Sequence, residues 1–399
     1  MPTPHGPLPR VALIGVSGYG GIYLQLLREA LLKKTVVLVA AVVINPNDVA
    51  DICSELRSYG AVIYTDTESF FSAESGRIDL CLIPVAIQWH ARLTVSALEA
   101  GMNVLVEKPL AGSVADIKAI RKAEAEFNRW VAVGFQDIYA IESRWLKAQL
   151  LAGVIGKLES IRMIGLWPRS RSYFTRNHWA GRIQADGAAV LDSPLNNAFA
   201  HFINLPLYLA GPTMDDSAGI KLRSANLHRA HQIENFDTAI VEGVTDEGAQ
   251  LWFGVSHTSA AIREPEIYIC GSKGRAEWWH EQRCVLIDEV GHRQVFPLPS
   301  AEETRRLMFA AVVDRLYHPS TFVCSTAMAE EHTKLIEAVQ RSGPVRDFPE
   351  SSITWVSDQT GLSERPVVCD LDEAMDEALV KGSPSLRLAP LSPSLVPPV

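Results

Sequence analysis

The sequence lacks the segments that would anchor it in a membrane or export it. Its 399 residues contain no apolar run of the roughly 18 residues that a membrane-spanning helix needs. The opening residues, MPTPHGPLPR, lack the apolar core of a signal peptide. No two cysteines have the spacing of a metal site or a redox motif: Cys53, Cys81, Cys270, Cys284, Cys324 and Cys369. We therefore expect a cytoplasmic protein with reduced, mostly buried thiols.

Positive charge is also scarce. The chain has 37 Lys and Arg against 46 Asp and Glu, a formal net charge of -9. Proteins that neutralise nucleic-acid phosphates are usually basic, so we expect no nucleic-acid partner. Histidines and cysteines do not gather at ligand spacing, and the pair His228 and His231 stands alone, so we expect no metal site.

Hydrophobic residues are plentiful, at 47% of a chain longer than one hydrophobic core usually serves. In the first half, short aliphatic runs alternate with helix-length segments, the pattern of parallel strands joined by helices. We predict strands at residues 11–15, 36–44, 61–64, 79–84, 103–106 and 131–134, and helices at 21–33, 88–100 and 114–127. Ser113 can cap the last helix, with Asp116 at its third position.

After about residue 150 the pattern becomes that of an antiparallel sheet. We predict strands at residues 158–166, 220–227, 238–242, 250–257, 266–270 and 276–279, and helices at 301–316 and 325–341. The expected fold is an α/β Rossmann domain (1–137), then an α+β domain with a large, mostly antiparallel open sheet (138–345), with one helix packing back on the first domain. Residues 346–399 form a partly irregular extension, and residues 382–399 a poorly ordered tail.

A glycine-rich turn, VALIGVSGYGGIY, joins the first predicted strand to the first helix. In a dinucleotide-binding fold this turn brings backbone N–H groups against the pyrophosphate. We predict cofactor contacts from the whole turn: Gly15, Ser17, Gly18, Tyr19, Gly20 and Gly21. Ser17 replaces the second glycine of the usual G-x-G-x-x-G pattern. The cofactor is expected to be NAD or NADP, with a slight preference for NAD because no Arg or Lys adjoins Asn45 at the end of the second strand.

Two further strand ends resemble those of the Gfo/Idh/MocA oxidoreductase family, which includes glucose-fructose oxidoreductase and inositol dehydrogenase. They are LIPVAIQWH, with Pro84 and His90, and NVLVEKP, with Glu107 and Lys108. The resemblance implies that Lys108 lies beside the nicotinamide and the reacting carbon, where an ammonium stabilises alkoxide character. It also implies cofactor contacts from Pro84, His90, Glu107, Lys108 and Gln136. Gln136 and Asp137 either contact a ligand or begin the next helix.

The segment LDSPLNNAFAHFINLPLYLAG is predicted as one helix, capped by Ser193 and ending near Gly211. Asn197 and His201 stand four residues apart on one face. The family resemblance implies that His201 is the general base and that an Asp usually occupies the position of Asn197. An amide can orient an imidazole but adds no negative charge to stabilise the imidazolium. The catalytic residues predicted are therefore Lys108, His201 and Asn197, with Asn197 orienting His201.

The segment between residues 166 and 187 is rich in aromatic, Arg and Asn residues, which bind sugar rings and their hydroxyl or carboxylate groups. The candidates, as a group, are Trp167, Arg169, Tyr173, Arg176, Asn177, His178, Trp179 and Arg182. Of these, Trp167, Arg169, Tyr173, Arg176 and Trp179 join Lys108, Asn197 and His201 as predicted substrate contacts. The alternative is a loop that packs against another subunit.

These features predict an NAD(P)-dependent dehydrogenase that acts on a secondary alcohol of a small-molecule sugar, sugar acid or cyclitol. One alternative is epimerase, lyase or glycosidase-type chemistry in which the cofactor is recycled in place. Another is a non-catalytic sugar or nucleotide-binding regulator, which the replacement at Asn197 allows. By resemblance, and because an apolar open sheet needs a cover, we expect a homodimer or homotetramer.

Overall fold

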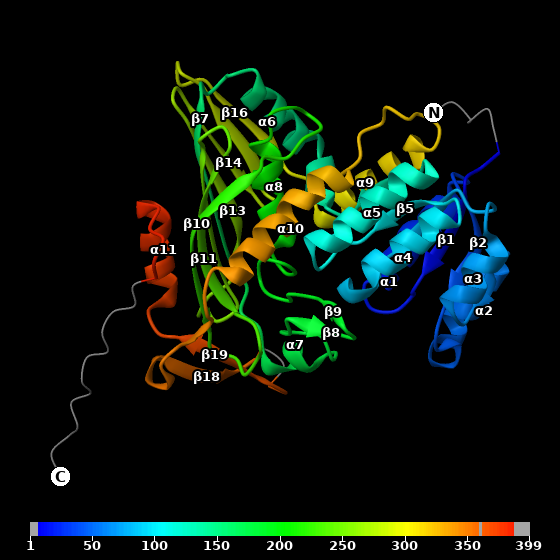
Figure 1. Cartoon of the computed structure of the whole chain (residues 1–399). Helices are drawn as coiled ribbons and strands as arrows, with labels where there is room; N and C mark the ends of the chain where they lie inside the picture. The colour runs from blue at the N-terminus through cyan, green and yellow to red at the C-terminus, as the bar shows by residue number, and fades with distance from the viewer. Residues whose placement is uncertain (1–6, 359–360, 387–399) are drawn as a thin grey trace, which may run out of the picture.

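The computed structural model describes residues 7–358 and 361–386, and Figure 1 shows two sheets with helices between and around them. The first is a six-stranded parallel sheet in the order β3-β2-β1-β4-β5-β6. Its strands are β1 (Arg10–Ile14), β2 (Val37–Val42), β3 (Val62–Tyr64), β4 (Leu80–Ile83), β5 (Asn103–Val106) and β6 (Val131–Val133). Most of their side chains are buried aliphatic groups, as in parallel sheets covered by helices on both faces. This confirms the predicted Rossmann sheet.

The helices of this sheet are α1 (Gly20–Leu32), α2 (Ala50–Ser58), α3 (Thr67–Glu74), α4 (Ile87–Glu99) and α5 (Val114–Phe127), with a short 3-10 turn, η1 (Pro46–Val49), before α2. We did not predict α2 or α3. A capping signal for α3 is present, because Asp66 accepts a hydrogen bond from the Ser69 N–H at 2.7 Å. The predicted cap of α5 forms, since the Asp116 N–H donates to the Ser113 hydroxyl at 3.1 Å.

The second sheet has nine strands in the order β16-β15-β14-β13-β7-β12-β11-β10-β17. These are β7 (Leu158–Leu166), β10 (Ile220–Arg229), β11 (Thr238–Thr245), β12 (Gln250–Ser256), β13 (Arg263–Gly271), β14 (Arg275–Trp279), β15 (Arg283–Ile287), β16 (Arg293–Pro297) and β17 (Arg346–Asp347). The pairs β7–β12 and β10–β17 are parallel, and the others are antiparallel. The predicted large, mostly antiparallel sheet is therefore confirmed, although β15, β16 and β17 were not predicted.

Three helices lie on the inner side of this sheet, toward the Rossmann sheet (Figure 1): α6 (Ile141–Leu151), α8 (Ala200–Leu209) and α10 (Thr326–Arg341). The helix α9 (Ala301–Arg315) lies on the Rossmann side instead, where it contacts α1 and the 3-10 turn η2 (Gln136–Tyr139) that precedes α6. α10 contacts α5, β6 and α8, and so joins the two sheets. An Arg121–Glu330 ion pair of 2.6 Å links α5 to α10.

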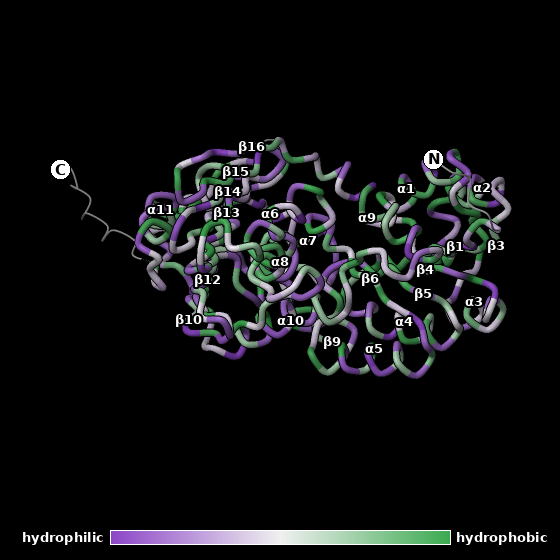
Figure 2. The backbone as a smooth tube through the Cα atoms, turned by 90° about the horizontal axis from the view of Figure 1, so that it is seen from above, coloured by the Kyte–Doolittle hydropathy of each residue, from purple (hydrophilic) through white to green (hydrophobic). Residues whose placement is uncertain are grey.

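The outer face of the nine-stranded sheet is partly covered by the same chain. After β17 come η3 (Glu350–Ser352), the hairpin β18 (Ile353–Ser357) and β19 (Glu364–Val368), and α11 (Leu371–Lys381). Figures 1 and 2 both show α11 on the side of the sheet opposite α8. The buried stripe of α11 includes Leu371, Met375 and Leu379, which belong to one apolar cluster with Ile164 and Trp252 of β7 and β12. A second copy is therefore not needed to cover this part of the sheet.

None of the helices within residues 7–358 and 361–386 has the length and apolar character required to cross a bilayer. In the same residues no group of three or more His, Cys, Asp and Glu side chains could hold a metal ion. All six cysteines are free thiols. Of the predicted tail at 382–399, residues 387–399 lie outside the described part of the chain.

Candidate active site

The glycine-rich turn follows β1 and leads into α1. Gly15 and Gly18 have positive φ angles of 87° and 59°, which favour glycine. A Cβ on Gly20 would lie 2.5 Å from the Gly15 carbonyl oxygen, so this position requires glycine as well, whereas Gly21 has open space. Among the described residues, none accepts a hydrogen bond from the N–H of Ser17 or Gly18. The turn thus has the free donors and the close backbone approach that a pyrophosphate needs.

The second strand ends beside this turn, as the topology of a dinucleotide-binding sheet requires. Asn45 is exposed three residues after β2 and precedes η1. No Lys or Arg adjoins it in the sequence. This position can hydrogen-bond ribose hydroxyls but offers no cation for a 2′-phosphate.

Lys108 follows β5, and buried side chains of Glu107 and His90 contact the backbone around it. The Glu107 carboxylate is buried and accepts hydrogen bonds from the Tyr23 hydroxyl at 2.8 Å and from the Lys108 N–H at 3.1 Å. The two nitrogens of the buried His90 ring lie 2.7 Å from the Pro109 carbonyl oxygen and 3.0 Å from that of Val85. Burial lowers the pKa of His90, and the neutral ring donates its one N–H to one of these carbonyls. The cofactor contact predicted for His90 stays a prediction; in this structure both ring nitrogens lie against backbone carbonyls and the ring is fully buried. Pro84, also buried, lies 3.9 Å from the position of a Gly20 Cβ.

The Lys108 ammonium reaches across to the second part of the chain. Its Nζ donates to the Asn197 carbonyl oxygen at 2.9 Å and to Asn197 Oδ1 at 3.2 Å. The Asn197 Nδ2 in turn donates to Asp192 Oδ1 at 2.8 Å. The predicted role of Asn197 as the group that orients His201 is therefore wrong, because its amide holds Lys108 instead.

The segment that carries these residues is a shorter helix than predicted. Residues 193–199 form successive turns, and α8 begins only at Ala200 and ends at Leu209. Ser193 Oγ does accept a hydrogen bond from the Asn196 N–H at 3.3 Å, as a cap would. However, Asn196 Nδ2 donates to the Val190 carbonyl at 2.9 Å, and the Phe199 N–H bonds Pro194 five residues back. These side-chain and backbone contacts compete with regular helix formation.

His201 lies in the first turn of α8 and faces Asp137 of η2. His201 Nδ1 is 3.6 Å from Asp137 Oδ2, and both atoms are buried without a hydrogen-bond partner. His201 Nε2 makes no hydrogen bond with any described residue, so it is available to a ligand. The carboxylate beside the imidazole thus comes from the end of β6 rather than from the residue four positions before His201.

The charges of these groups are set mainly by burial. Desolvation raises the pKa of Asp137 to about 7, although Arg305 opposes the shift. Desolvation, reinforced by the positive charge of Lys108, lowers the pKa of His201 well below its usual value. Burial also lowers the pKa of Lys108 and raises that of Asp192. The imidazole is therefore neutral near neutral pH, as a proton acceptor must be.

Gln136 lies beside Asp137 in η2. Its Nε2 donates to the Ala301 carbonyl of α9 at 3.3 Å, while its Oε1 is buried without a partner. Arg305, also on α9, acts electrostatically on Tyr19, Glu107 and Asp137. Sequence reasoning missed Arg305 and Asp192, since no motif singles out either residue.

Residues 167–192, here called the bridging segment, connect β7 to α8 and contain α7 (Arg171–Thr175), β8 (Gln184–Ala185) and β9 (Ala188–Ala189). The segment touches the Rossmann side, because Gln88 Nε2 of α4 donates to Asp186 at 3.0 Å. Gly112 allows another close approach, since a Cβ there would overlap the Ala189 carbonyl. The bridging segment therefore lies against the Rossmann side next to Lys108.

The candidate residues of this segment fall into two groups. The first group lies toward Lys108. The Trp167 ring stacks on the Phe199 ring with their centroids 4.6 Å apart. The Tyr173 ring contacts the guanidinium groups of Arg169 and Arg176, and the charge of Arg176 acts on Lys108. Trp179 packs in a small cluster with Ile87. The other group consists of Asn177, His178 and Arg182, which line a separate hollow of about 670 Å³. None of the predicted catalytic residues lines this hollow. This hollow is not the site around Lys108.

The sequence of residues 10–135 matches the model of the GFO_IDH_MocA oxidoreductase family with an NAD-binding Rossmann fold. An inositol 2-dehydrogenase of Azotobacter vinelandii is 32% identical over 294 residues, which cover 73% of this chain and 75% of that protein. A myo-inositol 2-dehydrogenase of Thermotoga maritima is 24% identical over 224 residues, covering 55% of this chain but only 63% of that protein.

Solved structures share the fold. The inositol dehydrogenase homologue of Azotobacter vinelandii with NAD+ has a TM-score of 0.70 at 19% identity, over 84% of this chain and 96% of its own. The WlbA dehydrogenase of Bordetella pertussis, in complex with NADH and UDP-GlcNAcA, has a TM-score of 0.68 at 20% identity, with the same coverage. The glycine turn, the two sheets and these matches agree, and the chain belongs to the Gfo/Idh/MocA family of NAD-binding oxidoreductases.

Proposed function

We propose that the protein is an NAD-dependent dehydrogenase that oxidises a secondary alcohol of a sugar, sugar acid or cyclitol. The observation that carries this proposal is that Lys108, just after β5, and His201, in the first turn of α8, come from distant parts of the chain to one site. The Lys108 Nζ donates to Asn197, four residues before His201, and His201 Nε2 makes no hydrogen bond with any described residue. The relatives named inositol 2-dehydrogenase support an alcohol substrate.

In this proposal His201 Nε2 accepts the proton of the substrate hydroxyl. The imidazolium that results is stabilised by the Asp137 carboxylate, whose Oδ2 is 3.6 Å from His201 Nδ1. Because the site is buried, an ion pair here is screened less than one at the surface. His201 and Asp137 therefore supply the base and its counter-charge.

Lys108 stabilises the substrate oxygen as its proton leaves. An ammonium has three N–H donors, and two of those of Lys108 bond Asn197. The third is free to meet an oxygen with growing negative charge. Asn197, anchored by Asp192, fixes the direction of this donor. We therefore assign Asn197 and Asp192 a positioning role.

The residues that would hold NAD are those of the glycine turn, with Asn45 at the ribose and the buried Gln136 Oε1 near the nicotinamide end. The cofactor, when bound, supplies the hydride acceptor for the carbon that carries the hydroxyl.

The test is the absorbance of reduced nicotinamide after the protein is mixed with NAD and a panel of sugars, sugar acids and inositols. Formation of NADH with one class of compound supports the proposal. Binding of NAD with no net reduction, but with conversion of the sugar, would instead support the recycled-cofactor chemistry. Binding without conversion of any compound would support a regulator.

We also propose that the protein assembles as a homodimer or homotetramer. Since α11 covers part of the outer face at β7 and β12, an assembly through this sheet would use the part of that face that α11 leaves uncovered. Sedimentation velocity of the full chain tests this proposal, and a single species of monomer mass would contradict it.

A further inference from the structure

Two arginines of the bridging segment lie around one aromatic ring. The Arg169 guanidinium carbon is 5.0 Å from the centroid of the Tyr173 ring, and that of Arg176 is 3.7 Å from it. Arg169 also lies 5.6 Å from the Trp167 ring. The aromatic rings orient both guanidinium groups without neutralising them.

Neither arginine has an acidic partner. Within residues 7–358 and 361–386, no carboxylate forms an ion pair with Arg169 or Arg176, whereas Arg229, Arg263 and Arg306 each have one. The Nε of Arg169 is buried and makes no hydrogen bond. A buried guanidinium donor without an acceptor is costly, so this atom is expected to meet a ligand oxygen.

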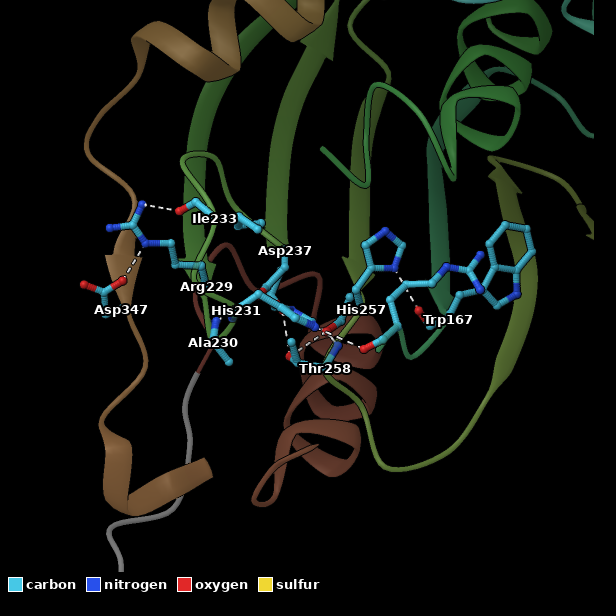
Figure 3. Close-up of polar contacts among 12 residues, drawn as sticks. Trp167, Arg229, Ala230, His231, Ile233, Asp237, His257, Thr258 and Asp347 are labelled. Carbon is cyan, nitrogen blue, oxygen red and sulfur yellow. Dashed lines mark hydrogen bonds and ion pairs between the residues drawn. The ribbon is translucent and has the colours of Figure 1, made fainter. Parts of the chain in front are cut away.

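The backbone that carries Arg169 is held firmly by the nine-stranded sheet. Figure 3 shows His257 directed at Trp167, whose carbonyl oxygen is 2.8 Å from His257 Nδ1. His231 Nε2 lies 3.0 Å from the Arg169 carbonyl oxygen, and its Nδ1 lies 2.8 Å from Asp237 Oδ2. The Arg169 N–H donates to the His257 carbonyl at 3.0 Å. These buried contacts pre-organise the arginine, which lowers the entropy cost of binding a ligand.

Packing places this pair of arginines beside the proposed catalytic site. The Trp167 ring, over which Arg169 lies, stacks on Phe199, which stands between Asn197 and His201 in the chain. Burial lowers the pKa of Lys108 and raises that of Asp192, and the positive charge of Arg176 adds to the first shift and opposes the second. Lys108, Arg169 and Arg176 thus bring three cations to this region. Its carboxylates are engaged within the protein: Glu107 by Tyr23 and the Lys108 N–H, Asp192 by Asn197 and by the Gly181 N–H at 2.6 Å, and Asp137 faces His201. An excess of cationic donors favours an anionic ligand.

We propose that Arg169 and Arg176 bind an oxo-acid group of the substrate, so that the protein acts on an anionic sugar rather than on a neutral sugar or inositol. This inference rests on the proposed dehydrogenase function. The shared chemistry is a carboxylate or phosphate that accepts paired N–H bonds from guanidinium. A sugar acid and a sugar phosphate both satisfy it.

The test compares matched substrates with NAD: D-gluconate and D-glucose 6-phosphate against D-glucose, and D-galacturonate against D-galactose. We expect Arg176→Ala to lower kcat/KM for the preferred acid by about 10- to 100-fold, as expected for loss of a hydrogen bond to a charged group. Values for neutral compounds should change little, and Arg169→Lys should cause a smaller loss. The control is Arg171→Ala, because the Arg171 guanidinium lies 4.0 Å from the Trp355 ring and lines the separate hollow.

Reduction of NAD by neutral compounds alone, or an equal loss for acid and neutral compounds in Arg176→Ala, would overturn the inference while leaving the proposed function intact. If no compound is oxidised, the proposed function fails, and titration calorimetry of the NAD-loaded protein with gluconate and glucose 6-phosphate still decides the inference. Tighter binding to the wild type than to Arg176→Ala supports it, and equal affinities refute it. A preference for one anion over the other identifies the oxo-acid.

Discussion

The ends of the neighbouring strands β5 and β6 use their buried polar groups in opposite ways. After β5, the Glu107 carboxylate accepts hydrogen bonds from Tyr23 and from the Lys108 N–H. His90 of the neighbouring helix α4 lies against the backbone carbonyls of Val85 and Pro109, so both residues support the backbone around Lys108. After β6, Gln136 Oε1 and Asp137 Oδ2 are buried and have no hydrogen-bond partner among the described residues, although Asp137 Oδ2 lies 3.6 Å from His201 Nδ1. The contacts of Glu107 and His90 hold the Lys108 cation in place, whereas Gln136 and Asp137 keep acceptor oxygens that can bind a proton or a ligand. The difference separates residues that build the site from those that act in it.

The largest expected effect is on kcat, when the Lys108 ammonium at the end of β5 is removed. Lys108→Ala should lower kcat by about 10²- to 10³-fold, because a pre-organised donor to the substrate oxygen is removed. NAD binding, measured by fluorescence titration, should persist, since the glycine turn is untouched. Lys118→Ala, on the exposed face of α5, is the control. Near-native turnover of Lys108→Ala would mean that this strand end only supports the fold.

The β6 end should respond to pH. The pKa of Asp137 is raised to about 7, so its carboxylate is present above that pH and is lost as the pH falls through it. We expect wild-type kcat/KM to rise through pH 7. Asp137→Asn should lower the plateau by about 10- to 100-fold, because the imidazolium loses a charged partner, and should abolish this inflection.

Asp48→Asn, an exposed change in η1, provides the control for the pH profile. A profile of Asp137→Asn that keeps the inflection near pH 7 would assign that titration to another group. Burial lowers the pKa of His201, so its titration affects the pH profile of kcat/KM at lower pH than that of Asp137. The contributions of His201 and Asp137 can therefore be distinguished.

The smallest effect should come from removing one of the hydrogen bonds that Glu107 accepts at the end of β5. Tyr23→Phe removes the hydrogen bond to Glu107 and should cost about 1 kcal/mol of the free energy of unfolding, measured in urea, with little change in kcat. The matched control is Tyr59→Phe, whose hydroxyl bonds Glu55 at 3.2 Å on the surface and should cost less. Equal losses in the two variants would show that burial of the Glu107 contact adds nothing.

Local signals predicted the elements of the first sheet well. The strand at residues 103–106 and the helix at 114–127 have the predicted bounds, because buried aliphatic runs and the Ser113 cap are encoded locally. The strand at 158–166 is equally accurate. The buried stripe of α11 was not predicted, although Leu371, Met375 and Leu379 recur at helical spacing and could have revealed it.

The site was predicted less completely. Lys108 and His201 lie where the motifs suggest, yet the partners assigned to them changed. Asn197 lies in the turns before α8, where its amide accepts from Lys108 and donates to Asp192, and it makes no hydrogen bond with His201. His90, predicted from the family resemblance as a cofactor contact, is buried in this structure against the backbone carbonyl of Pro109, next to Lys108.

The sequence by itself determined the parallel sheet, the glycine turn and the presence of a lysine at the end of β5. These depend on hydrophobic periodicity and on residues close together in the chain. Only the tertiary structure decided that Asp137 faces His201 across 64 positions and that α11 covers part of the second sheet. It also decided that Arg169 and Arg176 form no ion pair with any carboxylate in the described part of the chain. Such facts depend on which side chains meet after the chain folds, and contact between distant segments leaves no periodic signal in a single sequence.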